Sequence, residues 1–237
     1  TVTHDRDEAM EALIQQWTGR GGLARPDEHL IIASVREETA VLNERAQEIR
    51  KRAGVVRGGG IHIKGQRVHL GDRVIFTRKN KLFKVENGDM GRVTFVSRLT
   101  QNIRVRLDDG NTVTIPLLRY NDIQLGYAIT AHKAQGATVE NAYVLLGGRM
   151  QDRELSYVQL SRARGETRLF VQDGHDDRRL KSLVDAMSRS REKQLASRVA
   201  EAEQERKRAE ILGIQAQESP QQQQEEQQRV GPRLRML

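Results

Sequence analysis

The stretch Gly126–Val144, GYAITAHKAQGATVENAYV, decides how the rest of the chain is organised. It starts with small and β-branched residues, passes through a polar turn at His132–Gly136, and returns to an apolar run from Ala142 to Leu146. This order predicts a strand or short helix, then a loop, then a buried strand. The loop carries hydroxyl, imidazole, ammonium and amide groups. Because these groups suit contact with phosphate oxygens, the sequence predicts that the loop contacts phosphates.

Two motifs carry a resemblance to a known family. Thr130-x-His132-Lys133-x-Gln135-Gly136 resembles motif V of superfamily 1 DNA helicases of the RecD-like branch, and SYVQLSRAR at Ser156–Arg164 resembles motif VI. The wider run from Ile31 to Val171 resembles the C-terminal motor half of conjugative relaxase-helicases of the agrobacterial plasmid type. The resemblance implies an α/β fold, namely a second RecA-like (P-loop NTPase-like) motor domain with an inserted SH3-like β-barrel and a helical and disordered C-terminal tail.

The resemblance also implies domain boundaries. Residues 1–60 are expected to form the first part of the RecA-like domain, 61–120 the inserted barrel, and 121–174 the rest of the RecA-like domain with both motifs. Residues 175–237 are expected to be a charged helix, from Leu183 to Gly213, and a Gln-rich disordered tail, because the run at Gln221–Gln228 cannot bury a core.

Local patterns fill in the first of these parts. A helix capped by Asp5 is predicted to bury Leu13, Ile14 and Trp17, and the apolar run HLIIAS at His29–Ser34 predicts a strand of a parallel sheet. Val35–Lys51 is predicted to be helical. The polar candidates Ser34, Arg36 and Asn43 follow that strand, where open α/β sheets bind ligands, although Arg36 at a solvated helix start is the plainer interpretation.

A run of short strands is expected after Gly58–Gly60, which break the helical pattern. Asn87-Gly88 and Asp108–Asn111 are hairpin signals, and five short strands over this stretch predict a small barrel. The basic loop Arg78–Lys84 lies between two of the strands. Arg78, Lys79 and Lys81 are predicted to contact backbone phosphates, while a solvated hairpin tip is an equally good interpretation.

Composition favours a polyanionic partner. The formal net charge is +8 and the pI is about 10.0, which are typical of proteins that bind nucleic acid or an acidic surface. Of the 237 residues, 37% are hydrophobic and 30% are charged. There is no cysteine, which excludes disulfides, Cys-based zinc sites and thiol catalysis, and no metal site is expected. No apolar run approaches about 18 residues and the start has no signal-peptide core, so we expect no membrane segment and a cytoplasmic location.

The resemblance assigns roles to both motifs. Arg162 becomes an arginine finger that reaches nucleotide held by another domain, with Arg164 as its nearest rival; a surface arginine paired with Glu166 is the alternative. Gln135 and Gly136 point toward the nucleotide. Thr130, His132 and Lys133 point toward single-stranded DNA. The Glu that often follows the glycine in RecD-like helicases is replaced by Thr138, with Glu140 two residues further on, so a ribose contact is in doubt.

One absence limits what the chain is expected to do alone. It contains no G-x-x-x-x-G-K-[ST] loop and no apolar strand that ends in Asp-Glu. ATP and Mg²⁺ would therefore be bound mainly by an N-terminal RecA-like domain of the same protein, and this chain alone is not expected to hydrolyse ATP. The resemblance implies the C-terminal half of a helicase that translocates 5′ to 3′ on single-stranded DNA, with the conjugation machinery as a further partner. A stand-alone single-strand-binding module without catalysis and a decayed helicase remnant are the alternatives.

Overall fold

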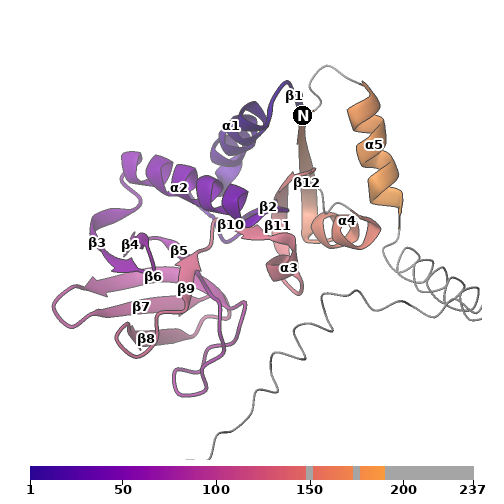
Figure 1. Cartoon of the computed structure of the whole chain (residues 1–237). Coiled ribbons are helices and arrows are strands. Elements are labelled where there is room, and N and C mark those ends of the chain that lie inside the picture. Colours follow the sequence, from indigo (N-terminus) through magenta and orange to yellow (C-terminus); the bar gives the residue numbers. More distant parts are fainter. Residues whose placement is uncertain (148–151, 173–176, 190–237) are drawn as a thin grey trace, which may run out of the picture. The chain divides into compact units, whose positions relative to one another are not determined.

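A five-stranded parallel sheet in the order β1-β12-β11-β2-β10 forms the centre of the α/β part of the chain (Figure 1). The computed structural model describes residues 1–147, 152–172 and 177–189. Its strands and helices are β1 (Val2–Thr3), α1 (Arg6–Trp17), the π-helical turn η1 (Thr18–Gly22), β2 (His29–Ala33), α2 (Arg36–Arg52), β10 (Ala128–Thr130), α3 (Ala131–Ala134), β11 (Val139–Leu145), α4 (Arg153–Leu160), β12 (Ala163–Gln172) and α5 (Asp177–Ser188).

Helices cover both faces of this sheet. Ile31 and Ala33 of β2 pack in one apolar cluster with residues of α1 and α2. Leu30 and Ile32 pack in a second cluster that includes residues of α3 and α4. Successive strand residues point to opposite faces, and all five residues of β2 are buried. This explains why HLIIA is apolar throughout and not alternating, and it confirms the predicted parallel strand.

The start of α1 follows the predicted cap. The Asp5 side chain accepts a hydrogen bond from the Glu8 backbone N–H at 2.7 Å, and Trp17 is fully buried at the other end of the helix. The Trp17 indole N–H donates to the His29 carbonyl at 2.9 Å, which ties α1 to β2. Both the helix and its buried face were therefore predictable.

Two antiparallel sheets occupy the stretch between α2 and β10. The larger has the order β8-β7-β6-β5-β9 and the smaller is the hairpin β3-β4. Their strands are β3 (Arg57–Ile63), β4 (Gln66–Leu70), β5 (Arg73–Phe76), β6 (Met90–Ser97), β7 (Asn102–Leu107), β8 (Thr112–Pro116) and β9 (Ile123–Leu125). The hairpin signal at Asp108–Asn111 is confirmed, because this segment joins the antiparallel strands β7 and β8 and Gly110 has a positive φ of 90°. Asn87-Gly88 instead lies near the end of the long connection between β5 and β6, where Gly88 has a φ of 99°.

Several predicted boundaries were wrong. Gly58–Gly60 were expected to break the pattern, yet they lie inside β3, where glycine is compatible with the register shift between Arg57 and Ile61. β4 and β9 were missed. The sequence of motif VI predicts a helix that ends near Arg164, whereas α4 ends at Leu160 and β12 already begins at Ala163. The helix expected to start at Leu183 begins at Asp177, and the rest of the predicted helix and the Gln-rich tail lie outside the described residues.

A buried polar network joins α2 to the antiparallel strands. Asp72 is fully buried and accepts hydrogen bonds from the Gln47 side chain (2.6 Å), the His69 backbone N–H (2.6 Å) and the Tyr127 hydroxyl (2.7 Å). Arg50 is also fully buried, donates to the Gly71 carbonyl at 3.3 Å and lies 5.5 Å from the centre of the Tyr127 ring. Since Tyr127 precedes β10, the network fixes the strand that leads into motif V.

We expect folding stability to depend on the protonation of His29. Its Nδ1 lies 3.1 Å from the Tyr143 hydroxyl, and burial lowers the pKa of His29 below 6.5. As the pH falls, His29 of the unfolded chain is protonated at a higher pH than His29 of the folded chain. The folding stability that is present above about pH 6.5 is therefore lost as the pH falls through the lower pKa of His29 in the folded state. Urea denaturation between about pH 7 and pH 5 should show this loss, at no more than about 1.4 kcal/mol per pH unit for one group.

His29→Gln is the variant that tests this dependence. It should flatten the pH dependence relative to the parent chain, whereas the matched variant His132→Gln, at an exposed histidine, should leave it unchanged. An equally steep dependence in His29→Gln would show that other groups carry it.

Candidate nucleic-acid interface

The motif V loop runs from one end of the parallel sheet to the other. Thr130 pairs with Ala33 at the carboxyl end of β2, whereas Val139 lies beyond the amino end of β2 and pairs with Ala163. Gly136, with φ 87°, makes the turn between α3 and β11, in a conformation that other residues rarely adopt. The structure therefore places Thr130 and Lys133 near the carboxyl edge of the sheet and Val139 near the amino edge, with Gln135 and Gly136 in the turn that connects them.

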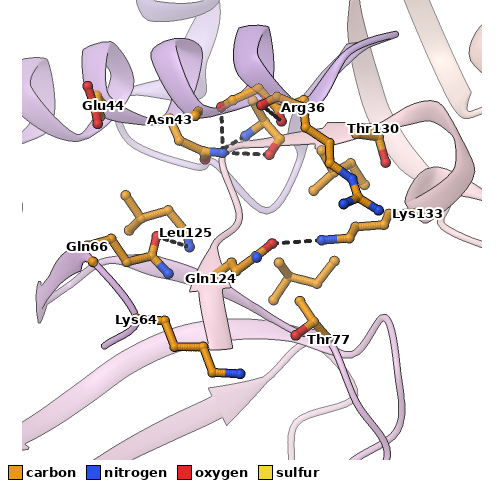
Figure 2. A pocket seen from close by; sticks show the side chains of 16 residues that line it. Arg36, Asn43, Glu44, Lys64, Gln66, Thr77, Gln124, Leu125, Thr130 and Lys133 are labelled. Atoms are coloured by element: carbon orange, nitrogen blue, oxygen red, sulfur yellow. Dashed lines mark hydrogen bonds between the residues drawn. The ribbon is translucent and has the colours of Figure 1, made fainter. Parts of the chain in front are cut away.

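A cavity of about 550 Å³ lies at the carboxyl edge, between α2, the β3-β4 turn, β5, β9 and β10 (Figure 2). Two of the predicted DNA-contacting residues, Thr130 and Lys133, line it. Its other polar or charged lining residues are Arg36, Thr39, Asn43, Glu44, Lys64, Gln66, Thr77 and Gln124. The third predicted residue of motif V, His132, is exposed and does not line the cavity.

The ammonium group of Lys133 is held in place by its neighbours in this cavity. Its ammonium group donates to Gln124 Oε1 at 2.7 Å, and Figure 2 shows it next to the guanidinium of Arg36. Burial, and then the nearby charge of Arg36, lower the pKa of Lys133. Two cations held together and partly withdrawn from water favour the binding of an anion between or beside them.

Lys64 of the β3-β4 turn was missed as a site residue. Lys64 and Gly65 both have positive φ, 44° and 83°, as in the two-residue hairpin turn that twists with its strands. The Lys64 ammonium contacts the carboxylate of Asp122. The alternation His62-Ile63 before Lys-Gly and Gln66-Arg67-Val68 after it was the signal that could have revealed both the hairpin and this cation.

The basic loop lies beside this cavity. Thr77, which lines the cavity, is followed by Arg78, whose guanidinium lies 3.9 Å from the Asp122 carboxylate. Lys79 forms an ion pair of 2.7 Å with Glu86, and Lys81 is exposed further along the loop. None of Arg78, Lys79 and Lys81 is among the described residues that line the cavity, and Arg78 comes nearest to it as the neighbour of Thr77.

Arg162 lies at the other edge of the sheet, against the motif V turn. Its Nη1 is 3.5 Å from the Ala137 carbonyl, and its Nη2 donates to Ser161 Oγ at 2.6 Å. Its Nε is buried and has no hydrogen-bond partner among the described residues. The alternative pairing with Glu166 is wrong, because Glu166 pairs with Arg20 (3.1 Å) and Arg168 (2.6 Å).

Arg164 has different surroundings. It lines a hollow of about 330 Å³ together with Asp27, Glu28 and Glu140, and Thr138 also lies there. Three carboxylates disfavour the entry of a phosphate. Of the two arginines, Arg162 is therefore better suited to a phosphate oxygen.

Two further polar candidates have structural roles. Asn43 is buried and makes hydrogen bonds in both directions: its Nδ2 donates to the carbonyls of Thr39 and Ala128, and its Oδ1 accepts from the backbone N–H groups of Tyr127 and Ala128. Ser34 Oγ accepts from the Gln159 side chain at 3.1 Å. Asn43 thus fixes β10 against α2, and Ser34 ties the end of β2 to α4.

Within residues 1–147, 152–172 and 177–189, no helix is long and apolar enough to cross a membrane. Over the same residues, no group of three or more His, Asp or Glu side chains could hold a metal ion.

Comparison with known proteins gives the chain its relatives. It is 32% identical over 168 residues to the conjugal transfer protein TraA of Agrobacterium fabrum, an alignment that covers 69% of this chain. It is 34% identical over 110 residues to the ATP-dependent RecD2 DNA helicase of Deinococcus radiodurans, which covers 45% of this chain. The chain spans 15% of the length of each of these relatives. No protein-family model matches.

The chain is thus a RecD-like protein related to the superfamily 1 helicases. Within that class, its relatives include conjugal transfer proteins TraA of more than one organism, since the TraA protein of Rhizobium radiobacter is 30% identical over 169 residues and also covers 69% of this chain. A solved structure of Bacteroides Pif1 bound to single-stranded DNA aligns with a TM-score of 0.47 and 19% identity, over 77% of this chain and 54% of that one. This similarity is too low to transfer any residue or activity.

Proposed function

We propose that the chain is the second motor domain of a longer DNA helicase of a conjugative transfer system, and that it holds single-stranded DNA at the carboxyl edge of its parallel sheet. In this proposal the antiparallel strands form the SH3-like barrel, inserted at about residues 61–120 between the two parts of the RecA-like domain, 1–60 and 121–174. Residues 175–237 would follow as a tail. The translocation polarity, 5′ to 3′, and the cytoplasmic location are proposed from the family resemblance and from the sequence.

The cavity at Lys133 carries the proposal. It combines cations from three separate elements, Arg36 of α2, Lys64 of the β3-β4 turn and Lys133 of α3, with the Thr130 hydroxyl. Ammonium, guanidinium and hydroxyl groups are the usual partners of phosphate and sugar oxygens. The amide side chains of Gln66 and Gln124 add donors and acceptors that a base edge or a sugar can use.

Arg162 fits the other half of the proposed function. The Arg162 guanidinium contacts Ala137 and Ser161 through its Nη atoms and forms no ion pair with any described residue, so its positive charge is available to a phosphate oxygen. ATP with Mg²⁺, bound mainly by the N-terminal RecA-like domain of the same protein, would supply the phosphoryl-transfer chemistry. In that complex Arg162 would bind the transferred phosphate and offset the negative charge that develops on it. Gln135 and Gly136 would lie next to the bound nucleotide.

Binding of a labelled oligothymidylate by the 237-residue chain tests the DNA half of the proposal. Lys133→Ala and Arg36→Ala are each expected to weaken binding about 5- to 10-fold and to reduce the slope of log K against log salt by about 0.7, since each removes one phosphate contact to a single strand. Fluorescence anisotropy over about 50 to 300 mM salt measures both quantities.

Arg25→Ala is the matched control, because Arg25 is an exposed arginine paired with Glu28, away from the cavity. It should keep the parent affinity and slope. Equal losses in all three variants would mean that only the net charge matters, and no salt dependence in the parent chain would contradict binding to DNA altogether.

A further inference from the structure

The outer face of strands β6 and β7 carries three exposed arginines. Arg92, Arg104 and Arg106 are exposed, while Val93 and Val105 between them are buried. The antiparallel register places Arg92 directly opposite Arg106. Like charges in that position repel one another. None of the three forms an ion pair with any described residue. This repulsion would be relieved by a bound polyanion.

A β-bulge turns an aromatic ring outward on the same face. The register shifts between Val93 and Phe95, so that Thr94 and Phe95 are both exposed and Phe95 pairs with Arg104. Phe95 is 47% exposed, and the Arg104 guanidinium lies 5.6 Å from the centre of its ring. Because bulges re-aim side chains, an aromatic ring held open to solvent beside a cation is a platform on which another flat ring can stack.

A hollow of about 440 Å³ opens beside this ring. Its walls are Phe95, the glycines Gly58–Gly60 of β3, the half-exposed Leu70 and two more arginines, Arg57 and Arg98. Arg98 donates to the carbonyls of Gly59 (2.5 Å) and Gly60 (2.7 Å). A Cβ on Gly59 would lie 2.0 Å from Arg98 Nη2, so the glycine is what lets the guanidinium lie along β3.

We propose that this face, defined by Arg92, Phe95, Arg104, Arg106 and the adjoining hollow, is a second binding surface for single-stranded nucleic acid. The arginines of β6 and β7 bind successive backbone phosphates, and one base stacks on Phe95 at the mouth of the hollow. A single strand fits better than a duplex, because the bases of a duplex are already stacked on one another and cannot reach the ring.

The second surface is separate from the first. Among the described residues, none lines both the cavity at Lys133 and the hollow beside Phe95. A strand held at Lys133 therefore leaves the outer face of β6 and β7 available to another segment or to another strand. The proposal does not depend on the function proposed above, since a chain that binds nothing at Lys133 can still bind here.

The test uses the 237-residue chain with Lys133→Ala and Arg36→Ala combined, so that binding at the first cavity is reduced. In that background, Phe95→Ala is expected to weaken binding of a labelled oligothymidylate a further 5- to 20-fold or so, and Arg104→Gln with Arg106→Gln to reduce the salt slope by about 1.4. Phe95→Trp keeps a stacking ring and should retain or increase affinity. A crosslink from a 5-iodouridine oligonucleotide to Phe95 would locate the base directly.

The controls are Leu118→Ala and Arg119→Gln, which remove an exposed apolar residue and an exposed arginine outside this face. Both should behave as the background chain. The proposal is overturned if Phe95→Ala matches the controls, if a duplex of the same length binds equally well and is indifferent to Phe95→Ala, or if polyglutamate of equal charge competes as well as the oligonucleotide. Unchanged thermal midpoints in the variants exclude a loss of fold as the cause.

Discussion

Arg162→Ala, made in the longer protein that carries a phosphate-binding loop, is expected to lower ATP turnover by about 10³- to 10⁵-fold while single-stranded DNA binding stays within about twofold of the parent. The reason is the position of the side chain. Arg162 lies against the motif V turn at Ala137, at the opposite edge of the sheet from Lys133, so its loss leaves the DNA cavity intact. Arg162→Lys should recover little, because an ammonium group cannot hold two phosphate oxygens as a planar guanidinium does.

Steady-state ATPase assays with saturating DNA measure the effect. Arg164→Ala is the matched control, two residues away in a hollow lined by carboxylates, and it should retain most of the turnover. Normal turnover in Arg162→Ala, or a loss in Arg164→Ala of the size expected for Arg162, would remove Arg162 from the catalytic role. Loss of DNA binding together with turnover would indicate a disturbed fold instead.

Asp72→Ala is expected to lower the free energy of unfolding of the chain by about 3–5 kcal/mol. The variant leaves three buried donors without an acceptor: the Gln47 amide, the His69 backbone N–H and the Tyr127 hydroxyl. Burial raises the pKa of Asp72 above its ordinary value, so the folded state loses part of the stabilisation from this group as the pH rises through that raised pKa. The network still needs the acceptor oxygens at neutral pH.

Urea denaturation of the parent and variant chains measures the change. Asp27→Ala, which removes an exposed aspartate, is the control and should change stability by less than about 0.5 kcal/mol. A loss of less than about 1 kcal/mol in Asp72→Ala would mean that water replaces the carboxylate and that the network contributes little. Tyr127→Phe removes the hydrogen bond to Asp72 and the longer one, 3.3 Å, that the hydroxyl accepts from the Arg73 backbone N–H, and should cost about 1–2 kcal/mol.

The sequence could predict those parts of the fold in which a few neighbouring residues determine the local backbone structure. Asp5 caps α1, the continuous apolar run at His29–Ala33 is a central strand, and Gly88 and Gly110 make turns, all for reasons contained in a few neighbouring residues. Gly58–Gly60 were misassigned because glycine favours a break by its own propensity, whereas here the pairing of the flanking residues Arg57 and Ile61 with β4 and the contact with Arg98 keep the glycines in a strand.

The candidate sites show the same division. The resemblance of the two motifs to those of superfamily 1 helicases suggested Thr130, Lys133 and Arg162 as candidates, and the structure puts the first two in one cavity. Lys64 and Gln124 could not be found that way, because they come from a turn and a short strand that meet the cavity only through the folding of the antiparallel sheet. Asn43 was a candidate that the structure does not support as a ligand contact. Its place in the sequence after a strand suggested such a contact, but its four hydrogen bonds are made to the backbone of α2, of Tyr127 and of β10.

The connection between β10 and β11 has one more consequence. It begins at Thr130, level with Ala33, and ends at Val139, level with Ala163, so it runs from the carboxyl ends of the strands back to their amino ends through α3 and the turn at Gly136. The length of this segment, more than its individual side chains, therefore sets the distance between the end of the sheet that carries Lys133 and the end that lies next to Arg162. Inserting or deleting one residue in this segment would keep the side chains at both ends of the sheet. It would shift the position of those at one end relative to those at the other.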